Sequence, residues 1–238
     1  MQPSLLIFDL DGTLIDSERD LILSVNAALE HIGMTTLDDH VVRSYVGDGA
    51  PILIRRAIGE SATDTQHAEA LAFFLNYYRA HMLDNTVLYP GVREALDRLR
   101  TAGVPMSVLT NKPVRFSRDI VKGLGLHDHF FQVYGGNSFD QKKPHRMGVD
   151  QLIQEAGAAR ETTWMIGDSA TDILTARNAE IRSIGVTYGF KPESLVGTPP
   201  DLLLDSFDQI PTHLLGTRDW MIRTGPSRPE GTSGESAL

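Results

Sequence analysis

The feature of this sequence that most restricts its fold is a series of short, mainly apolar runs separated by segments with helical periodicity. The runs fall at residues 5–8, 104–109, 131–134, 164–166, 184–186 and 202–204. Strands that are covered on both faces are apolar along most of their length, whereas half-exposed strands alternate polar and apolar residues. The runs therefore predict buried strands.

Helix patterns with recognisable ends lie between these runs, at residues 92–102, about 113–124, 146–156 and 170–179. Pro113 suits the first turn of a helix, and Gly157 suits the position just after one. Regular alternation of strands and helices predicts an α/β fold in which helices cover both faces of a parallel sheet.

Residues 17–85 interrupt this alternation, because they contain helix patterns at 20–33, 38–47, 51–59 and 66–83 and no strand signal. So long a segment exceeds what one crossover between parallel strands needs. We predict a helical domain at 17–85, inserted into an α/β core formed by residues 1–16 and 86–215. Residues 216–238 are rich in Gly, Ser, Pro and charge, and are predicted to be disordered.

The composition excludes several classes of function. The formal net charge of −9 over 238 residues disfavours nucleic acid and anionic membranes as partners. There is no cysteine, so disulfides and thiolate sites are excluded. No apolar run approaches the roughly 20 residues that span a bilayer, and the N-terminus lacks the basic flank of a signal peptide. We therefore expect a soluble, cytoplasmic protein.

Two aspartates follow the first apolar run, in "LLIFDLDGTLIDS". Residues i and i+2 of an extended chain point to the same side, so Asp9 and Asp11 should project together. Gly12 permits a sharp turn, and Thr13 adds a hydroxyl group. Ligands of open parallel sheets bind at the carboxyl ends of the strands, which is where these residues are expected.

Further polar side chains follow or flank later strands: Thr110, Asn111, Lys142, Lys143, Asp168 and Asp172. Each has an ordinary explanation when taken alone, such as a helix cap, a turn or a solvated charge. If the strand ends converge, however, Asp9, Asp11 and Asp168 share one volume, and a cation must offset their repulsion. Oxygen ligands suit Mg²⁺, and a lysine beside a hydroxyl and an amide suits a phosphoryl group.

The segments "DLDGTLIDS", "LTNK", "KKPH" and "GDSATD" resemble, in this order, the four motifs of the haloacid dehalogenase superfamily. The resemblance extends to about residue 215 and implies a Rossmann-like core with an inserted helical cap. Asp11 points to the phosphatases and phosphomutases of the superfamily, because its dehalogenases lack an acid there. "SYVGDGAPILIRRAIG", "GGNSFDQKKPH" and "GVTYGF" look like phosphoglycolate phosphatases, although Asn137 and Arg146 replace the usual Asp and Pro of that pattern.

The resemblance also implies roles for individual residues. Asp9 would be the nucleophile that forms an aspartyl-phosphate, and Asp11 the general acid and base. Mg²⁺ would be bound by Asp9, by the backbone carbonyl of Asp11, and by Asp168 and Asp172. The residues implied to contact substrate are Thr13, Thr110, Asn111 and Lys143. Lys143 is preferred over Lys142 because it directly precedes Pro144, and Lys142 is expected to be a solvated neighbour.

For residues 17–85 the resemblance implies a cap that closes over the site and selects the substrate. Arg56 is a candidate for a substrate carboxylate, with a solvated position or an internal ion pair as the alternative. Gly47 and Gly49 suggest a loop that approaches the ligand, with simple helix ends as an equal alternative. Glu18 and Arg19 lie in the expected hinge, and either is a candidate for contact with the substrate.

We therefore predict a Mg²⁺-dependent phosphomonoester hydrolase for a small anionic metabolite, with 2-phosphoglycolate as the first candidate. Another sugar phosphate, a nucleotide, pyrophosphate or a β-phosphoglucomutase-type reaction remains an alternative. A vestigial phosphate-binding module is disfavoured, because Asp9, Asp11, Lys143 and Asp168 are all present. The chain is expected to be a monomer or a homodimer.

Overall fold

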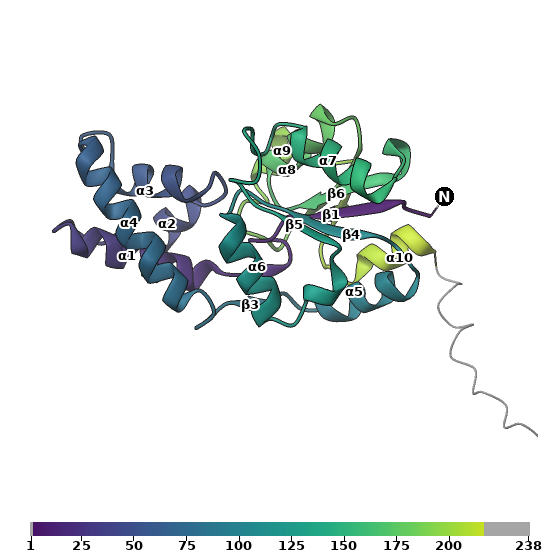
Figure 1. Ribbon diagram of the computed structural model, residues 1–238, viewed down its shortest axis with the longest axis horizontal. Coiled ribbons are helices and arrows are strands. Elements are labelled where there is room, and N and C mark those ends of the chain that lie inside the picture. The colour runs from purple at the N-terminus through teal and green to yellow at the C-terminus, as the bar shows by residue number, and fades with distance from the viewer. Residues whose placement is uncertain (1, 217–238) are drawn as a thin grey trace, which may run out of the picture.

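The computed structural model describes residues 2–216 and contains a six-stranded parallel sheet in the order β5-β4-β1-β6-β7-β8 (Figure 1). Its strands are β1 (Leu5–Phe8), β4 (Met106–Leu109), β5 (Gln132–Tyr134), β6 (Thr163–Gly167), β7 (Arg182–Val186) and β8 (Leu202–Leu204). The chain builds outward from β1 in one direction to β5 and then in the other to β8. This topological switch at β1 is where ligands of such sheets bind. The predicted α/β fold is confirmed.

Helices cover both faces of the sheet (Figure 1). They are α5 (Val92–Thr101), α6 (Val114–Gly123), α7 (Met147–Ala156), α8 (Ala170–Asn178), α9 (Ser194–Gly197) and α10 (Gln209–Leu215), with short 3₁₀ turns η1 (His127–His129) and η2 (Arg160–Thr162). Leu5 and Ile7 of β1 belong to the apolar cluster that includes α7 and α8 residues. Leu6 and Phe8 belong to the cluster that includes α5, α6 and α10 residues. Both faces of β1 are buried, which explains its continuous apolar sequence.

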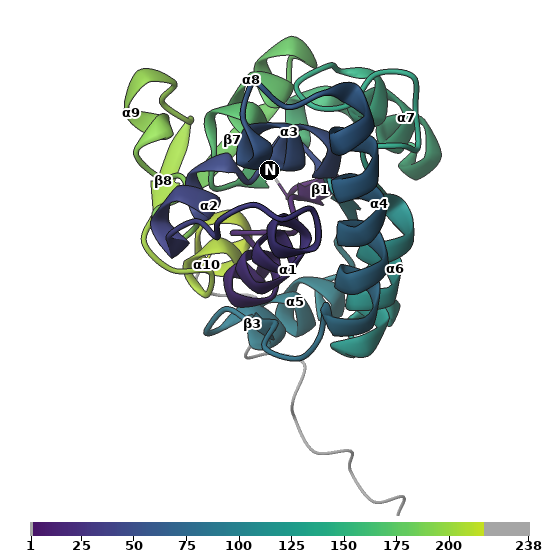
Figure 2. The ribbon, with the colours of Figure 1, turned by 90° about the vertical axis from the view of Figure 1, so that its left-hand side faces the viewer.

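Four helices form the insertion: α1 (Glu18–His31), α2 (Asp39–Tyr45), α3 (Ala50–Ile58) and α4 (Asp64–His81). They gather at one end of the molecule, away from the N-terminus (Figure 1), and face the viewer in Figure 2. Their apolar faces share a buried cluster that includes Leu21, Ile54 and Phe74. The same cluster includes Leu6 and Phe8 of β1, so the apolar interior runs without a break from the insertion into the core.

A two-stranded antiparallel ribbon joins the insertion to the core, with β2 (Ile15–Asp16) paired to β3 (Val87–Leu88). Buried Asp20 stands just beyond it and accepts hydrogen bonds from the backbone and side chain of both Asn85 and Thr86, at 2.7–3.1 Å. The outgoing and returning chains are thereby held side by side. Strands of two residues are too short to show any periodicity, and the ribbon was not predicted.

Among the described helices, none combines the length and the apolar character needed to cross a membrane. The predicted disorder of the C-terminal segment falls, from residue 217 onward, outside the described residues.

Candidate active site

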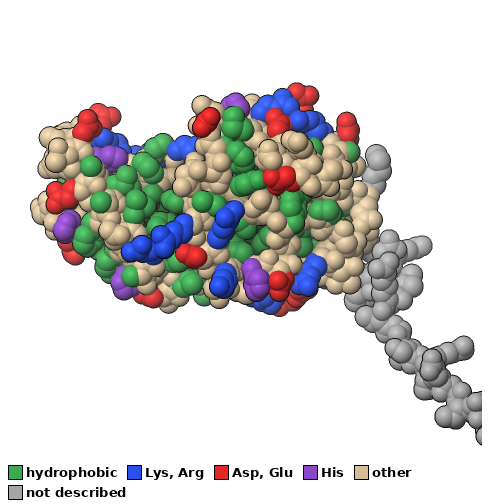
Figure 3. All heavy atoms as spheres, viewed as in Figure 1, with side chains coloured by type: hydrophobic (Ala, Val, Ile, Leu, Met, Phe, Trp, Pro, Cys, Tyr) green, Lys and Arg blue, Asp and Glu red, His purple; other side chains and the backbone are tan. Residues whose placement is uncertain are grey.

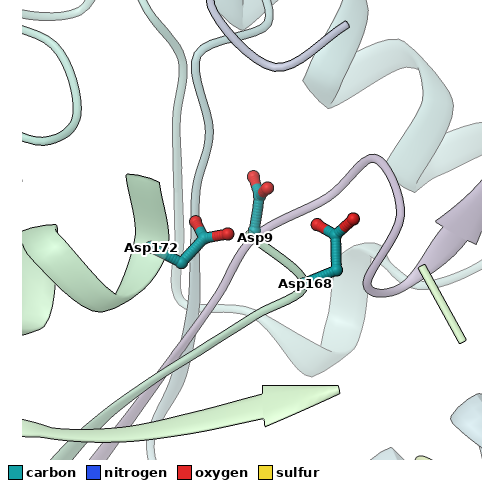
Figure 4. Close-up of side chains that lie close together, drawn as sticks. All are labelled: Asp9, Asp168 and Asp172. Atoms are coloured by element: carbon teal, nitrogen blue, oxygen red, sulfur yellow. The ribbon is translucent and has the colours of Figure 1, made fainter. Parts of the chain in front are cut away.

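Three carboxylates meet at the carboxyl ends of β1 and β6. Asp9 directly follows β1, Asp168 directly follows β6, and Asp172 lies in the first turn of α8. One oxygen atom of each lies within 4.8 Å of the others, and the side chains converge on one space (Figure 4). The sequence placed these residues at separate strand ends, and the fold brings them together.

The position of Asp168 is fixed by close backbone packing. A Cβ on Gly189 would lie 2.2 Å from the Asp168 Cβ, and one on Gly12 would lie 2.4 Å from its Oδ2. The backbone N–H groups of Phe190 and Lys191 donate to the same Oδ2 at 2.6 and 3.2 Å. The glycines of "DGT" and "YGF" are therefore needed because a carboxylate occupies the space that a side chain would fill.

Lys143 supplies the positive charge of this cluster. Its Nζ lies 2.8 Å from Oδ1 of Asp9 and 2.6 Å from Oδ1 of Asp172, and its side chain is 2% exposed. Burial acts to lower the pKa of Lys143, but the charges of Asp172 and Asp9 outweigh it and raise that pKa. The lysine therefore remains an ammonium at neutral pH and holds the Asp9 carboxylate in place.

One ammonium does not balance three carboxylates. Burial raises the pKa of Asp9 to about 6 against the opposing charge of Lys143, and burial together with Asp172 and Asp9 raises the pKa of Asp168 to about 8. If all three carboxylates are ionised, two negative charges remain after Lys143 is counted. A divalent cation would offset both. Oxygen donors without Cys or His fit a hard ion such as Mg²⁺, so these residues could hold one.

Asp11 belongs to a second charged group beside the first. Its Oδ1 accepts hydrogen bonds from Lys112 Nζ at 2.8 Å and from Ser17 Oγ at 2.5 Å. Lys112 is 5% exposed, and its ammonium lies 4.6 Å from the centre of the Tyr78 ring. Burial acts to lower the pKa of Lys112, but the neighbouring Asp11 charge helps raise it overall. The Asp11 carboxylate is thus held by one partner from the core, Lys112, and one from the hinge, Ser17.

Sequence reasoning had not assigned Lys112 or Tyr78 to the site. Lys112 stands inside the quoted "LTNK", directly after a strand and a Thr-Asn pair, and this position was the available signal. Tyr78 lies on α4 among apolar residues and looks like part of an ordinary helix face. Its contact with the core depends on how α4 packs, which has no counterpart in the local sequence.

Thr110 and Asn111 lie close to Lys112 and Lys143. The Thr110 hydroxyl accepts a hydrogen bond from the Lys112 backbone N–H at 3.2 Å. Asn111 Nδ2 donates to the backbone carbonyls of Lys143 and Gly47, both at 3.1 Å. Asn111 therefore connects the core to the loop between α2 and α3. Thr13 is fully buried, and its hydroxyl finds no hydrogen-bond partner within residues 2–216.

Two basic residues bind the loop between α2 and α3. Arg56 forms an ion pair with Asp48 at 2.6 Å and donates to the Tyr45 carbonyl at 3.1 Å, so its guanidinium is engaged inside the insertion. Lys142 Nζ donates to the Asp48 carbonyl at 2.5 Å. The expectation that Lys142 is only a solvated neighbour was therefore wrong, because it holds the core against the insertion.

The expected hinge residues pair with α2. Glu18 lies 3.4 Å from Arg43, and Arg19 lies 3.5 Å from Asp39 in an exposed pair. Arg43 also donates to the backbone carbonyls of Gly189 and Phe190. These contacts connect the start of α1, through α2, to the loop that holds Asp168.

A cavity of about 660 Å³, part of it open to solvent, lies between the core and the insertion. Its core side includes Asp9, Asp11, Thr110, Asn111, Lys112, Asp168, Phe190 and Lys191. Its other side includes Leu21, Val46, Gly47, Gly49, Leu53, Phe74 and Tyr78. In Figure 3 the outline of the molecule is indented along its upper edge between the insertion and the core. The charged wall belongs to the core, and the insertion supplies mainly apolar surface. Arg56 does not line this cavity.

The family model for haloacid dehalogenase-like hydrolases matches residues 6–186. The chain belongs to this family, and the resemblance stated from its motifs is confirmed. The phosphoglycolate phosphatase of Chromobacterium violaceum is 40% identical, over 85% of this chain and 92% of the relative. That of Vibrio vulnificus is 39% identical, over 87% and 93%. A crystal structure of a predicted phosphoglycolate phosphatase from Haemophilus somnus has a TM-score of 0.84 at 31% identity, over 88% of this chain and 97% of the other.

The two departures from the phosphoglycolate phosphatase pattern lie outside the cavity lining. Asn137 Oδ1 accepts a hydrogen bond at 2.9 Å from the N–H of Val114, the first residue of α6. An aspartate would offer the same oxygen. Arg146 donates to Asp150 one turn further along α7, at 2.8 Å. Both residues therefore have structural partners, and neither alters the charged groups of the site.

Proposed function

We propose that this protein is a Mg²⁺-dependent phosphomonoester hydrolase that works through an aspartyl-phosphate, with 2-phosphoglycolate as its first candidate substrate. The observation that carries the proposal is the Asp9–Lys143 ion pair beside Asp168 and Asp172 at the end of the central strand. The names of the relatives, which share about 40% of their residues with this chain, support the substrate.

Asp9 is the nucleophile of the proposed reaction. Its carboxylate oxygen attacks phosphorus, a P–O bond forms to Asp9, and the bond between phosphorus and the substrate's ester oxygen breaks. The Lys143 ammonium at 2.8 Å offsets the repulsion between this carboxylate and the negative phosphoryl group. It also limits the rotation of the Asp9 side chain before attack.

Asp11 is the acid and then the base. It donates a proton to the departing ester oxygen, which leaves as an alcohol. It next accepts a proton from the water that attacks the aspartyl-phosphate, and cleavage of the P–O bond to Asp9 releases inorganic phosphate. Lys112 and Ser17 hold the Asp11 carboxylate during both steps.

The residues that would hold Mg²⁺ are Asp9, Asp168 and Asp172 through their carboxylates and Asp11 through its backbone carbonyl. When bound, the ion neutralises charge on the phosphoryl oxygens. Phe190 and Lys191 orient the Asp168 carboxylate through their backbone N–H groups.

Thr110, Asn111 and Thr13 are proposed to contact the substrate, and residues 17–85 are proposed to form the cap over the site. The apolar side chains of Leu53 and Phe74 on the cavity wall support this role, because they exclude water from the reacting groups. We also propose that the protein acts in the cytoplasm on a small phosphorylated metabolite.

The test is hydrolysis of 2-phosphoglycolate and of p-nitrophenyl phosphate with Mg²⁺ and with EDTA. We expect turnover of both that requires Mg²⁺, and loss of turnover in Asp9→Asn. A ranking of phosphorylated metabolites by kcat/KM then identifies the substrate. Absence of hydrolysis of every phosphomonoester at any Mg²⁺ concentration would refute the proposal.

A further inference from the structure

Lys191 contributes two different groups to the site. Its backbone N–H binds the carboxylate of Asp168, and its half-buried side chain lines the cavity. The ammonium lies 3.7 Å from the position that a Cβ on Gly47 would occupy. The Gly47 carbonyl in turn accepts a hydrogen bond from Asn111, so the Lys191 ammonium lies beside the loop that Asn111 binds.

No carboxylate within residues 2–216 pairs with this ammonium. Asp48 is the carboxylate whose charge acts most strongly on Lys191, but it is already bound by Arg56 at 2.6 Å. Lys112, the other lysine on the cavity wall, is held by Asp11. Of the two lysines that line the cavity in the described part of the chain, Lys191 is therefore the one without a carboxylate partner.

The neighbouring charges do not provide the Lys191 ammonium with a counterion. Burial lowers the pKa of Lys191, and Arg56 acts in the same direction, while Asp48, Asp168 and Glu193 oppose them. Asp168 is expected to be occupied by a metal ion, and Asp48 by Arg56. A partly desolvated ammonium without a partner is unfavourable, and an anionic group of a ligand would stabilise it.

We propose that Lys191 binds the second anionic group of the substrate, a carboxylate, and so determines specificity for short carboxylated phosphomonoesters. This inference rests on the proposed function. It assigns the substrate carboxylate to Lys191 instead of to Arg56. The backbone of Lys191 is fixed to Asp168, so its ammonium lies within one lysine side chain of the metal-binding carboxylates. A substrate that spans from Asp9 to Lys191 must therefore be short.

The rest of the cavity wall supports this assignment. On the insertion side the wall is formed largely by apolar side chains such as Leu53, Phe74 and Tyr78, which offer no cation. A substrate whose far end is uncharged would leave Lys191 unpaired. The carboxylate should therefore contribute to substrate affinity rather than to the chemical step.

The experiment compares 2-phosphoglycolate with ethyl phosphate, in which a methyl group replaces the carboxylate. It measures kcat and KM for the wild type, Lys191→Met and Lys191→Arg, with the exposed Lys122→Met as the matched control. We expect Lys191→Met to lower kcat/KM for 2-phosphoglycolate about 10- to 100-fold, through KM, as for loss of a charged hydrogen bond. The value for ethyl phosphate should change by less than about threefold, and Lys191→Arg should restore part of the preference.

Lys191→Met retains the backbone N–H to Asp168, so an unchanged Tm and an unchanged Mg²⁺ requirement will confirm an intact site. An equal loss for both substrates, or an unchanged ratio, overturns the inference. A selective loss in Arg56→Met but not in Lys191→Met also overturns it and returns the contact to Arg56. If the wild type hydrolyses ethyl phosphate and 2-phosphoglycolate equally well, the inference fails while the phosphatase function stands. If it hydrolyses no phosphomonoester, the proposed function fails.

Discussion

Lys112 Nζ lies 2.8 Å from Oδ1 of Asp11, in a buried ion pair that Tyr78 covers from the insertion. The acid–base residue of the proposed mechanism is therefore held by a lysine that is itself in contact with α4. The ion pair therefore connects the proposed acid–base residue at the edge of the sheet to helix α4 of the insertion.

Replacing Lys112 tests the importance of this pair. Lys112→Met keeps the length and apolar body of the side chain but leaves Asp11 without its ammonium partner. We expect kcat for p-nitrophenyl phosphate to fall about 10- to 100-fold with a smaller change in KM, since breaking a buried pair costs several kcal/mol in total and part of that appears as stability. A wild-type kcat in a folded Lys112→Met variant would contradict the role.

The two aspartates of "DLDGT" should respond differently to amide substitution. Asp9→Asn should abolish both turnover and formation of the phospho-enzyme, because it removes the nucleophile. Asp11→Asn should retain Mg²⁺ binding, since its proposed metal contact is a backbone oxygen, and should lower kcat about 10²- to 10⁴-fold. Phospho-enzyme trapping and Mg²⁺ titration distinguish the two. Near wild-type turnover by Asp11→Asn would exclude it as the acid and base.

Mg²⁺ should stabilise the folded chain, and more strongly at higher pH. A carboxyl whose pKa is raised in the folded state favours its protonated form there, so Asp9 and Asp168 lower the stability of the metal-free chain as pH rises from the ordinary value of 3.8 through about 8. A bound cation removes this effect. At about 100 times its Kd, Mg²⁺ should contribute about 2.7 kcal/mol, or roughly 5–10 °C in Tm.

Thermal unfolding with Mg²⁺ and with EDTA at about pH 5 and about pH 8.5 measures this stabilisation. Asp168→Asn is the control, and it should reduce the Mg²⁺-dependent shift at both values. An equal shift in Asp168→Asn and wild type would place the ion elsewhere.

A methyl group added at Gly189 should disturb the acidic cluster although no charged residue is replaced. The added Cβ would lie 2.2 Å from the Asp168 Cβ, so the carboxylate must move. We expect Gly189→Ala to raise the Mg²⁺ concentration for half-maximal activity at least about tenfold, as for the loss of a residue that orients a metal ligand. Gly197→Ala, where no atom lies within 4 Å of the added Cβ, is the control and should resemble the wild type.

Asp20 should be important for stability rather than for catalysis. In Asp20→Asn the new amide group would face N–H and O–H donors from Asn85 and Thr86, and the unfolding free energy should fall by about 2–3 kcal/mol. Asp39→Asn removes only an exposed pair with Arg19 and should cost less than about 1 kcal/mol. Chemical denaturation measures both. Equal stability of the two variants would contradict the role of Asp20 at the hinge.

The fold and the acidic cluster could be predicted because each depends on a local pattern. A strand with both faces covered must be apolar throughout, as at residues 5–8, and parallel strands must present their carboxyl ends at one edge. Asp9 and Asp168 follow two such strands directly. To predict that these two residues lie close together therefore required only the correct order of the strands in the sheet.

The partners of the lysines could not be predicted in the same way. Lys112 follows β4 closely, and Lys142 and Lys143 lie in the loop between β5 and α7, yet the three bind Asp11, the Asp48 carbonyl and Asp9 respectively. The choice depends on side-chain directions and on where the insertion lies above the sheet. Lys191 was missed for the same reason, because its ammonium meets a loop 144 positions earlier in the chain, at Gly47.

The ribbon formed by β2 and β3 has a consequence for the evolution of such proteins. Asp16 and Val87 are paired across one ladder, so about 4.8 Å separates the two ends of a 70-residue detour. A hairpin of a few residues would bridge that gap and leave Asp9, Asp11 and Asp168 where they are. Lineages could therefore shorten, enlarge or exchange the inserted helices without moving these three carboxylates.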